Sequence, residues 1–188
     1  MHSKKELRKI AIDIRNSLDN ETISSRIVNN ILSWDVFLQA KNVMIFYPIN
    51  SEVNLLSLLT KQDKNFYFPK IITNDIIPVF YDKRLGFTKG KFNILEPQGC
   101  VLEDYSKLDL ILLPAVAVNC LGYRLGYGKG FYDKFLKMLD KSNTISCVPI
   151  AKSLIFNDLP IESHDEKFDY LITEDEIITS GNLDVLNP

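Results

Sequence analysis

The sequence has few of the residues that build disulfide frameworks and histidine-based sites. Its three cysteines, Cys100, Cys120 and Cys147, are far apart and form no C-x-x-C pair, which argues against a disulfide framework or a structural zinc site. Its two histidines are His2 and His164. Two histidines disfavour both a multi-histidine metal site and a histidine-dependent catalytic triad. We therefore expect free thiols and chemistry that depends on other side chains.

Long apolar runs and a large excess of either charge are also missing. No run approaches the roughly 18 to 20 apolar residues of a membrane-spanning helix, and the N-terminus is charged and amphipathic, unlike a signal peptide. The formal net charge of −2 disfavours a protein that binds nucleic acid through its overall field. We expect one cytoplasmic domain over residues 1–188, with no nucleic-acid or membrane partner.

Residues 1–34 are predicted to form a helical segment that packs on the rest of the domain. Ser3 and Glu6 match a capping box at the start of one apolar stripe of helical spacing, and a second stripe covers residues 23–32. Lys4 and Arg8 are four residues apart and so share one face of the first helix. Simple solvation of both cations is the alternative interpretation.

Apolar runs alternate with helical patterns over the remaining chain. The predicted strands are residues 43–47, 66–69, 76–81, 108–114, 145–150 and 170–173, and the predicted helices are residues 55–59 and 132–139. Pro78 favours a sheet edge for its strand, and the nearly continuous apolar run 108–114 is typical of a strand buried on both faces. The alternation predicts an α/β fold of three layers, a mostly parallel sheet flanked by helices. Residues 180–188 are expected to be a frayed tail.

Ligands of such sheets bind beyond the carboxyl ends of the strands. The segments that follow Tyr47 and Pro114 both leave predicted carboxyl ends. Glu52 and the glycine-rich segment after Pro114 are therefore expected to face one crevice.

That glycine-rich segment, called the glycine loop below, is Arg124-Leu125-Gly126-Tyr127-Gly128-Lys129-Gly130-Phe131-Tyr132-Asp133. Glycines at alternate positions allow positive φ, so that consecutive N–H groups can turn toward one anion, and a helix starting near Gly128 would add its dipole. The spacing matches neither the P-loop nor the G-x-G-x-x-G pattern, so a different phosphate site is implied. The alternative is a glycine-rich turn with Lys129 and Arg124 merely solvated.

These segments resemble the 5-formyltetrahydrofolate cyclo-ligase family, also called methenyltetrahydrofolate synthetase, over nearly the whole length. The matching segments are residues 4–8, 47–53, 113–133, 160–165 and 173–174. Val118 and Asn119 stand where members often have Phe-Asp, and Leu154 stands where a glutamine is frequent.

The resemblance implies a set of site residues. Lys129, Arg124 and Tyr132 are the implied catalytic residues, and Asp133 and Asp165 the implied Mg²⁺ ligands. The implied ATP-binding residues are Lys4, Lys5, Arg8, Arg124, Leu125, Gly126, Tyr127, Gly128, Lys129, Gly130, Phe131 and Tyr132. The implied folate-binding residues are Tyr47, Glu52, Tyr127, Gly128, Lys129, Gly130 and Phe131.

From residue preference alone, several of these positions have ordinary structural interpretations. Asp133 would be read as a helix cap and Asp165 as a turn residue. Phe131 is expected to pack the helix on the sheet and Tyr132 to contact ligand. His164 is expected to orient its loop rather than act as a general base.

The resemblance further implies ATP- and Mg²⁺-dependent conversion of 5-formyltetrahydrofolate to 5,10-methenyltetrahydrofolate, through a phosphorylated formyl group. It also implies a monomer, with a fold similar to the sugar-phosphate isomerases and CoA transferases. Two alternatives stay open: a non-catalytic relative that binds folate or nucleotide, and an isomerase or deaminase of similar architecture that needs no ATP.

Overall fold

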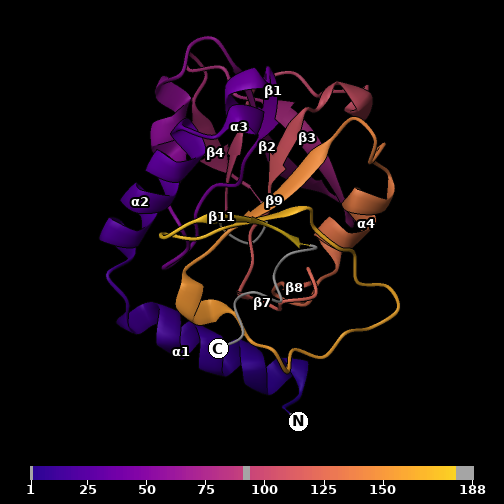
Figure 1. Ribbon diagram of the computed structural model, residues 1–188. Helices are drawn as coiled ribbons and strands as arrows, with labels where there is room; N and C mark the ends of the chain where they lie inside the picture. The colour runs from indigo at the N-terminus through magenta and orange to yellow at the C-terminus, as the bar shows by residue number, and fades with distance from the viewer. Residues whose placement is uncertain (1, 91–93, 181–188) are drawn as a thin grey trace.

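The computed structural model describes residues 2–90 and 94–180, so all of the predicted tail except Ser180 lies outside the described residues. Figure 1 shows the arrangement of the helices and strands. The helices are α1 (Lys4–Ser17), α2 (Asn20–Leu32), α3 (Asp35–Gln39) and α4 (Phe131–Lys137), with 3-10 turns η1 (Leu56–Thr60), η3 (Tyr105–Lys107) and η4 (Lys152–Leu154). The strands are β1 (Asn42–Met44), β2 (Asn65–Ile72), β3 (Asp75–Phe80), β4 (Phe87–Lys89), β5 (Leu95–Pro97), β6 (Leu110–Leu112), β7 (Ala117–Val118), β8 (Arg124–Leu125), β9 (Ile145–Pro149), β10 (Tyr170–Ile172) and β11 (Ile177–Thr179).

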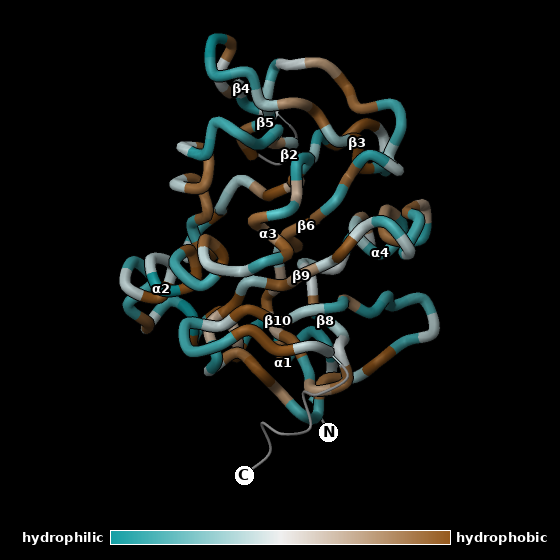
Figure 2. The backbone as a smooth tube through the Cα atoms, turned by 45° about the horizontal axis from the view of Figure 1, so that its top comes forward, coloured by the Kyte–Doolittle hydropathy of each residue, from teal (hydrophilic) through white to brown (hydrophobic). Residues whose placement is uncertain are grey.

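One seven-stranded sheet forms the centre of the molecule, in the order β11-β10-β9-β6-β1-β2-β3. The strands from β10 to β2 run parallel, and the edge strands β11 and β3 are antiparallel to their neighbours. The prediction of a mostly parallel sheet is confirmed, as is the edge position of the Pro78 strand. In Figure 2 these inner strands are mainly hydrophobic, as burial on both faces requires.

Helices cover both faces of the sheet, which confirms the predicted three layers. Side chains that alternate along β1 belong to different cores: Met44 packs with Leu7 of α1 and Phe135 of α4, whereas Val43 packs with Ile27 of α2. Figure 1 accordingly shows α2 and α4 on opposite sides of the sheet. None of the helices within residues 2–90 and 94–180 is both long and apolar enough to cross a membrane.

The start of α1 follows from its sequence. The Ser3 hydroxyl accepts a hydrogen bond from the Glu6 N–H, and the Glu6 carboxylate accepts from the Ser3 N–H, so the predicted capping box is present. Leu7 and Ala11 are buried, and α1 packs against η4 and β7. The burial of these two residues sets the orientation of α1 about its axis, and so the direction in which Lys4 and Arg8 point.

One predicted element was wrong. The helix predicted over residues 55–59 is instead the 3-10 turn η1 (Leu56–Thr60), because so short a run gains few helical hydrogen bonds. Arg124 and Leu125 form β8, which pairs with β7, so the glycine loop begins within a hairpin. Helix α4 (Phe131–Lys137) confirms the helix predicted over residues 132–139. It does not extend back to Gly128, because Gly130 takes a left-handed conformation at φ 66°.

Candidate active site

A cavity of about 410 Å³ opens beyond the carboxyl ends of β1 and β6, and it brings together segments far apart in the sequence. Its lining includes Lys4 and Arg8 of α1, Glu52 of the segment after β1, and Gly126 to Asp133 of the glycine loop. The expectation that Glu52 and the glycine loop face one crevice is confirmed. Much of the remaining lining is apolar, formed by Ile49, Pro69, Ile71, Ile76, Ile94 and Leu95.

Helix α1 presents two of its predicted cations to the cavity and turns the third away. The Lys4 ammonium contacts Asp165 Oδ2 at 2.6 Å and Glu162 Oε2 at 2.8 Å. Arg8 Nε donates to the Gly126 carbonyl at 2.7 Å. Simple solvation is therefore wrong for both. Lys5 is exposed and does not line the cavity among the described residues.

The glycine loop passes close to Arg8, which explains one of its glycines. Gly128 has a φ of 93°, and a Cβ built on it would lie 3.2 Å from Arg8 Nη2. A side chain at this position would be strained and would crowd the guanidinium. Lys129 is exposed at the cavity wall and Phe131 is half-buried, packing against the core that lies under α1 and α4.

Arg124 and Asp133, at the two ends of the loop, form a buried ion pair. Arg124 Nη2 lies 3.1 Å from Asp133 Oδ1, and the Arg124 side chain is only 3% exposed. Its Nε has no hydrogen-bond partner in the described part of the chain. Arg124 is therefore not the solvated residue of the alternative interpretation, and it fixes a carboxylate at the cavity wall.

Tyr132 packs beside this pair. The Arg124 guanidinium carbon lies 5.4 Å from the centre of the Tyr132 ring, within cation–π range. Burial raises the pKa of the Tyr132 hydroxyl, so this group stays protonated and can donate a hydrogen bond but not act as a base at neutral pH.

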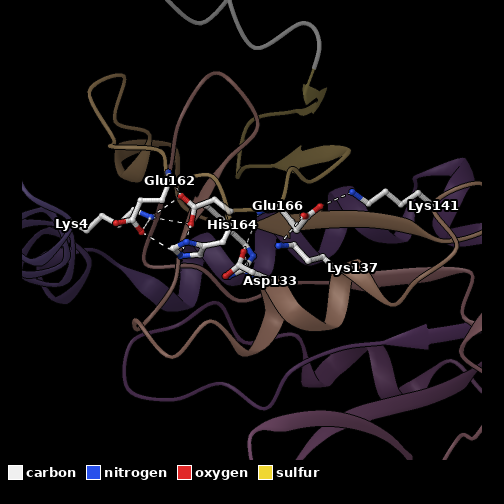
Figure 3. Close-up of polar contacts among 9 residues, drawn as sticks. Lys4, Asp133, Lys137, Lys141, Glu162, His164 and Glu166 are labelled. Atoms are coloured by element: carbon white, nitrogen blue, oxygen red, sulfur yellow. Dashed lines mark hydrogen bonds and ion pairs between the residues drawn. The ribbon is translucent and has the colours of Figure 1, made fainter.

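A second group of charges lies where α1 meets the loop after η4 (Figure 3). Glu162, His164 and Asp165 have ligand atoms within 4.8 Å of one another, with the Lys4 ammonium bound between the carboxylates. Burial raises the pKa of Asp165, but hydrogen bonds from Lys4 and from the Glu162 N–H outweigh it and leave this pKa lowered. Asp165 is thus held ionised at the cavity wall.

Glu52 is a buried carboxylate that also lines the cavity. Its Oε2 accepts from the Ile49 N–H at 3.0 Å, whereas Oε1 has no hydrogen-bond partner among the residues that the structure describes. Burial raises the pKa of Glu52, and the Ile49 N–H, Arg15 and Tyr127 only partly oppose this rise. A buried acceptor without a partner favours a ligand with an N–H or O–H group.

The remaining predicted position, Tyr47, also lines the cavity. Its ring packs edge-on against Phe87 of β4, with 5.1 Å between the ring centres.

Sequence reasoning missed two buried polar residues beside this site. Arg15, seven residues after Arg8 and hence on the same side of α1, donates to the Tyr127 hydroxyl at 2.8 Å. Glu96 lines the cavity, and its Oε1 accepts from the Ile71 N–H at 3.3 Å. The seven-residue spacing from Arg8 could have placed Arg15 near the site. No sequence pattern could have placed Glu96 there, because its strand β5 was not predicted.

The positions that depart from the family pattern have structural roles. The Asn119 side-chain oxygen accepts from the N–H groups of Leu121 and Tyr123, and so shapes the turn before the glycine loop. Leu154 is 1% exposed in the core beside α1 and does not line the cavity in the described part of the chain. These contacts explain why an amide fits at 119 and an apolar side chain at 154.

The donor atoms at the cavity wall are suited to Mg²⁺. Asp133 and Asp165 both line the cavity and offer carboxylate oxygens, and this ion is usually held by one or two carboxylates together with phosphate oxygens and waters. Each carboxylate has a cationic partner, Arg124 and Lys4 respectively. Both carboxylates are thereby held in place at the cavity wall.

Comparisons with known proteins match most of the length of the chain. The model of the 5-formyltetrahydrofolate cyclo-ligase family matches residues 1–174. A probable 5-formyltetrahydrofolate cyclo-ligase of Schizosaccharomyces pombe is 27% identical over 180 residues, covering 86% of this chain and 87% of its own. The Haemophilus influenzae enzyme of this name is 27% identical over 176 residues, covering 89% and 94%.

Solved structures show the same fold. The NMR structure of Aquifex aeolicus 5,10-methenyltetrahydrofolate synthetase has a TM-score of 0.83 and 31% identity, covering 94% of this chain and 92% of that one. A Mycoplasma pneumoniae 5,10-methenyltetrahydrofolate synthetase, at 21% identity, has a TM-score of 0.74 over 92% and 99% of the two chains. The match extends from the N-terminal cations through the glycine loop to residue 174, and the chain belongs to the 5-formyltetrahydrofolate cyclo-ligase family of ligases.

Proposed function

We propose that this enzyme converts 5-formyltetrahydrofolate to 5,10-methenyltetrahydrofolate, with hydrolysis of ATP to ADP and phosphate. The observation that carries the proposal is the mixed lining of this cavity, and we assign its charged and apolar residues to two ends. The charged end is assigned Lys4, Arg8, Lys129 and the two aspartates Asp133 and Asp165, as a nucleoside triphosphate with its metal ion requires. The apolar end is assigned the buried carboxylate Glu52 and the apolar lining residues, as a flat ring carrying N–H donors requires.

The chemistry needs activation of the formyl oxygen, which is a poor leaving group in an amide. Transfer of the γ-phosphoryl group to this oxygen releases ADP and gives a formyl phosphate derivative. The anilino nitrogen of the folate then attacks the activated carbon, loses its proton, and expels phosphate with the original formyl oxygen. No nucleophile of the protein is consumed, so the protein contributes positioning and charge stabilisation.

The residues of the charged end supply that stabilisation. Lys4, Arg8 and Lys129 are proposed to contact phosphate oxygens, while the N–H groups of the glycine loop approach them between the side chains. Arg124, which also lines the cavity, is proposed to hold Asp133 in place, and Tyr132 to donate a hydrogen bond. Mg²⁺ held by Asp133 and Asp165 would neutralise phosphate charge during the transfer.

At the apolar end, Glu52 is proposed to accept hydrogen bonds from N–H groups of the pterin through its unpartnered Oε1, with Tyr47 beside it. The cytoplasmic location, the monomeric state and the likeness to sugar-phosphate isomerases and CoA transferases stay predictions.

An isotope experiment tests the phosphorylated intermediate directly. With ¹⁸O in the formyl group, the label is expected in the inorganic phosphate, because the formyl oxygen leaves with the phosphoryl group. Label released into water with unlabelled phosphate would contradict the mechanism. Phosphate release that does not require folate would favour a simple ATPase instead.

The two alternatives differ from the proposal in their need for ATP. An isomerase or deaminase would turn over its substrate without nucleotide, and a non-catalytic relative would bind folate without turnover. The cations and carboxylates that face one cavity favour the ligase over an isomerase or deaminase, because neither of those needs a site for a triphosphate and its metal ion. A non-catalytic relative could keep such a site, and only ATP-dependent turnover separates it from the ligase.

Replacing Glu52 by glutamine is expected to separate stability from binding. Because burial raises the folded-state pKa of Glu52, its charged form opposes folding at neutral pH, and the neutral amide should raise the melting temperature there. The difference in melting temperature between the variant and the wild type should shrink as pH falls below the folded-state pKa, where the wild-type side chain is also neutral.

The same substitution is expected to weaken substrate binding. The KM for 5-formyltetrahydrofolate should rise roughly 10- to 100-fold, as expected for losing a hydrogen bond to a charged group. Melting curves over a pH series and steady-state kinetics measure the two effects; a lower melting temperature with unchanged KM would contradict both.

A further inference from the structure

Arg15 is a buried cation that lies behind the cavity wall rather than in it. Its side chain points from the last turn of α1 into the protein, and the residue is 4% exposed. It is not among the described residues that line the cavity. Burying a guanidinium destabilises the fold unless its N–H groups are hydrogen-bonded, so the contacts of Arg15 indicate why it is buried here.

Those contacts join three segments of the site. Arg15 Nη2 donates to the Tyr127 hydroxyl at 2.8 Å, in the glycine loop. Nε donates to Ser51 Oγ at 3.3 Å, one residue before Glu52, and Nη1 reaches the Ala115 carbonyl at 3.5 Å, after β6. The fork of one guanidinium can bond all three at fixed positions, which the point charge of a lysine cannot.

Arg15, Glu52 and Tyr127 are also coupled by charge. Arg15 favours the ionised form of Glu52, and burial together with the charge of Glu52 raises the pKa of the Tyr127 hydroxyl, which Arg15 partly opposes. Tyr127 is 42% exposed at the cavity, so a ligand can contact the ring whose hydroxyl Arg15 holds. Loss of Arg15 would leave both Tyr127 and Glu52 in the cavity wall without this partner.

We propose that Arg15 is a positioning residue, which fixes Tyr127 of the glycine loop and Glu52 relative to each other for the folate substrate. The inference rests on the proposed function for the identity of that ligand. It predicts that loss of Arg15 weakens the binding of folate but not that of ATP. Tyr127 and Glu52 would no longer be held in place, whereas Lys4 and Arg8, the proposed phosphate-binding cations, keep their own contacts.

The experiment compares Arg15→Lys, Arg15→Gln, Tyr127→Phe and the double variant Arg15→Gln/Tyr127→Phe. Removing the Arg15 fork should raise the KM for 5-formyltetrahydrofolate roughly tenfold or more, the size expected for a lost charged hydrogen bond, with little change in the KM for ATP. Tyr127→Phe should have a clear effect in the wild-type protein and almost none in the Arg15→Gln protein, because the two residues act as one unit. Arg26→Gln, at an exposed arginine of α2 paired with Asp175, is the matched control and should change neither KM.

Equal rises in both KM values, additive effects of the two substitutions, or an unchanged folate KM in Arg15→Lys would overturn the inference. If Arg15→Gln does not fold, Arg15→Lys and Tyr127→Phe decide it alone. If the wild-type protein shows no ATP-dependent turnover, the proposed function fails. Calorimetric binding of 5-formyltetrahydrofolate then still tests Arg15: weaker binding by Arg15→Lys supports it, and unchanged or absent binding by both proteins overturns it.

Discussion

Replacing Lys129 by alanine is expected to lower ATP-dependent turnover on the order of 100-fold or more, as for loss of one preorganised donor of charge stabilisation. Lys129 is exposed on the glycine loop and lines the cavity, and it is no part of either core. The melting temperature should therefore change little. Steady-state kcat with saturating folate and ATP measures the first effect, and thermal unfolding measures the second.

The matched control for Lys129→Ala is Lys134→Ala. Lys134 is an exposed lysine of α4 five residues further along, and it does not line the cavity within the part of the chain that the structure describes. The Lys134→Ala substitution also removes one positive charge close to the glycine loop in sequence, and it should leave turnover near the wild-type value. Near-normal turnover in Lys129→Ala, or an equal loss in Lys134→Ala, would remove Lys129 from the catalytic machinery.

Replacing Asp133 by asparagine is expected to raise the magnesium requirement and to weaken the fold. One of the two proposed carboxylate ligands is lost, and changes even to the partners of metal ligands typically cost roughly 10- to 100-fold in affinity. The buried Arg124 guanidinium also loses its ionic partner, which should lower the free energy of unfolding by about 1–3 kcal/mol. Magnesium titrations of turnover and denaturant unfolding without magnesium measure the two effects separately.

Asp175→Asn provides the control for this second substitution, because Asp175 pairs with Arg26 and Lys152 at the exposed surface. It should change neither the magnesium requirement nor, to any large extent, the stability. An unchanged magnesium titration in Asp133→Asn would take Asp133 out of the metal site. Unchanged stability would mean that its pair with Arg124 contributes little.

The layers of this fold were predictable because burial leaves a direct trace in sequence. Strands such as β6, buried on both faces, read as continuous apolar runs, and the Ser3–Glu6 capping box marks the start of α1 through local hydrogen bonds. Strand β11 and the short hairpins β4–β5 and β7–β8 were not predicted. Two- or three-residue strands carry no readable period, and they form because tertiary contacts complete their pairing.

The resemblance to the family predicted most of the charged residues that line the cavity, but not the partners of these residues. The predicted residues are Lys4, Arg8, Glu52, Arg124, Lys129, Asp133 and Asp165. Arg124 was expected to contact ATP, and its burial against Asp133 depends on β8, which no local pattern indicated. The pairing of Lys4 with Asp165 joins residues 161 positions apart, so it follows only from packing of α1 against the loop after η4. The fold therefore decides which predicted residue can touch ligand and which holds another in place.

The measurement that tests the proposed activity most directly is the growth of near-ultraviolet absorbance from the conjugated methenyl product. The purified protein is mixed with 5-formyltetrahydrofolate and Mg²⁺, with ATP and without it. Absorbance growth only in the presence of ATP is the predicted result, since the formyl oxygen must be phosphorylated before it can leave. Equal growth without ATP, or no growth from a folded protein that binds folate, would contradict the account.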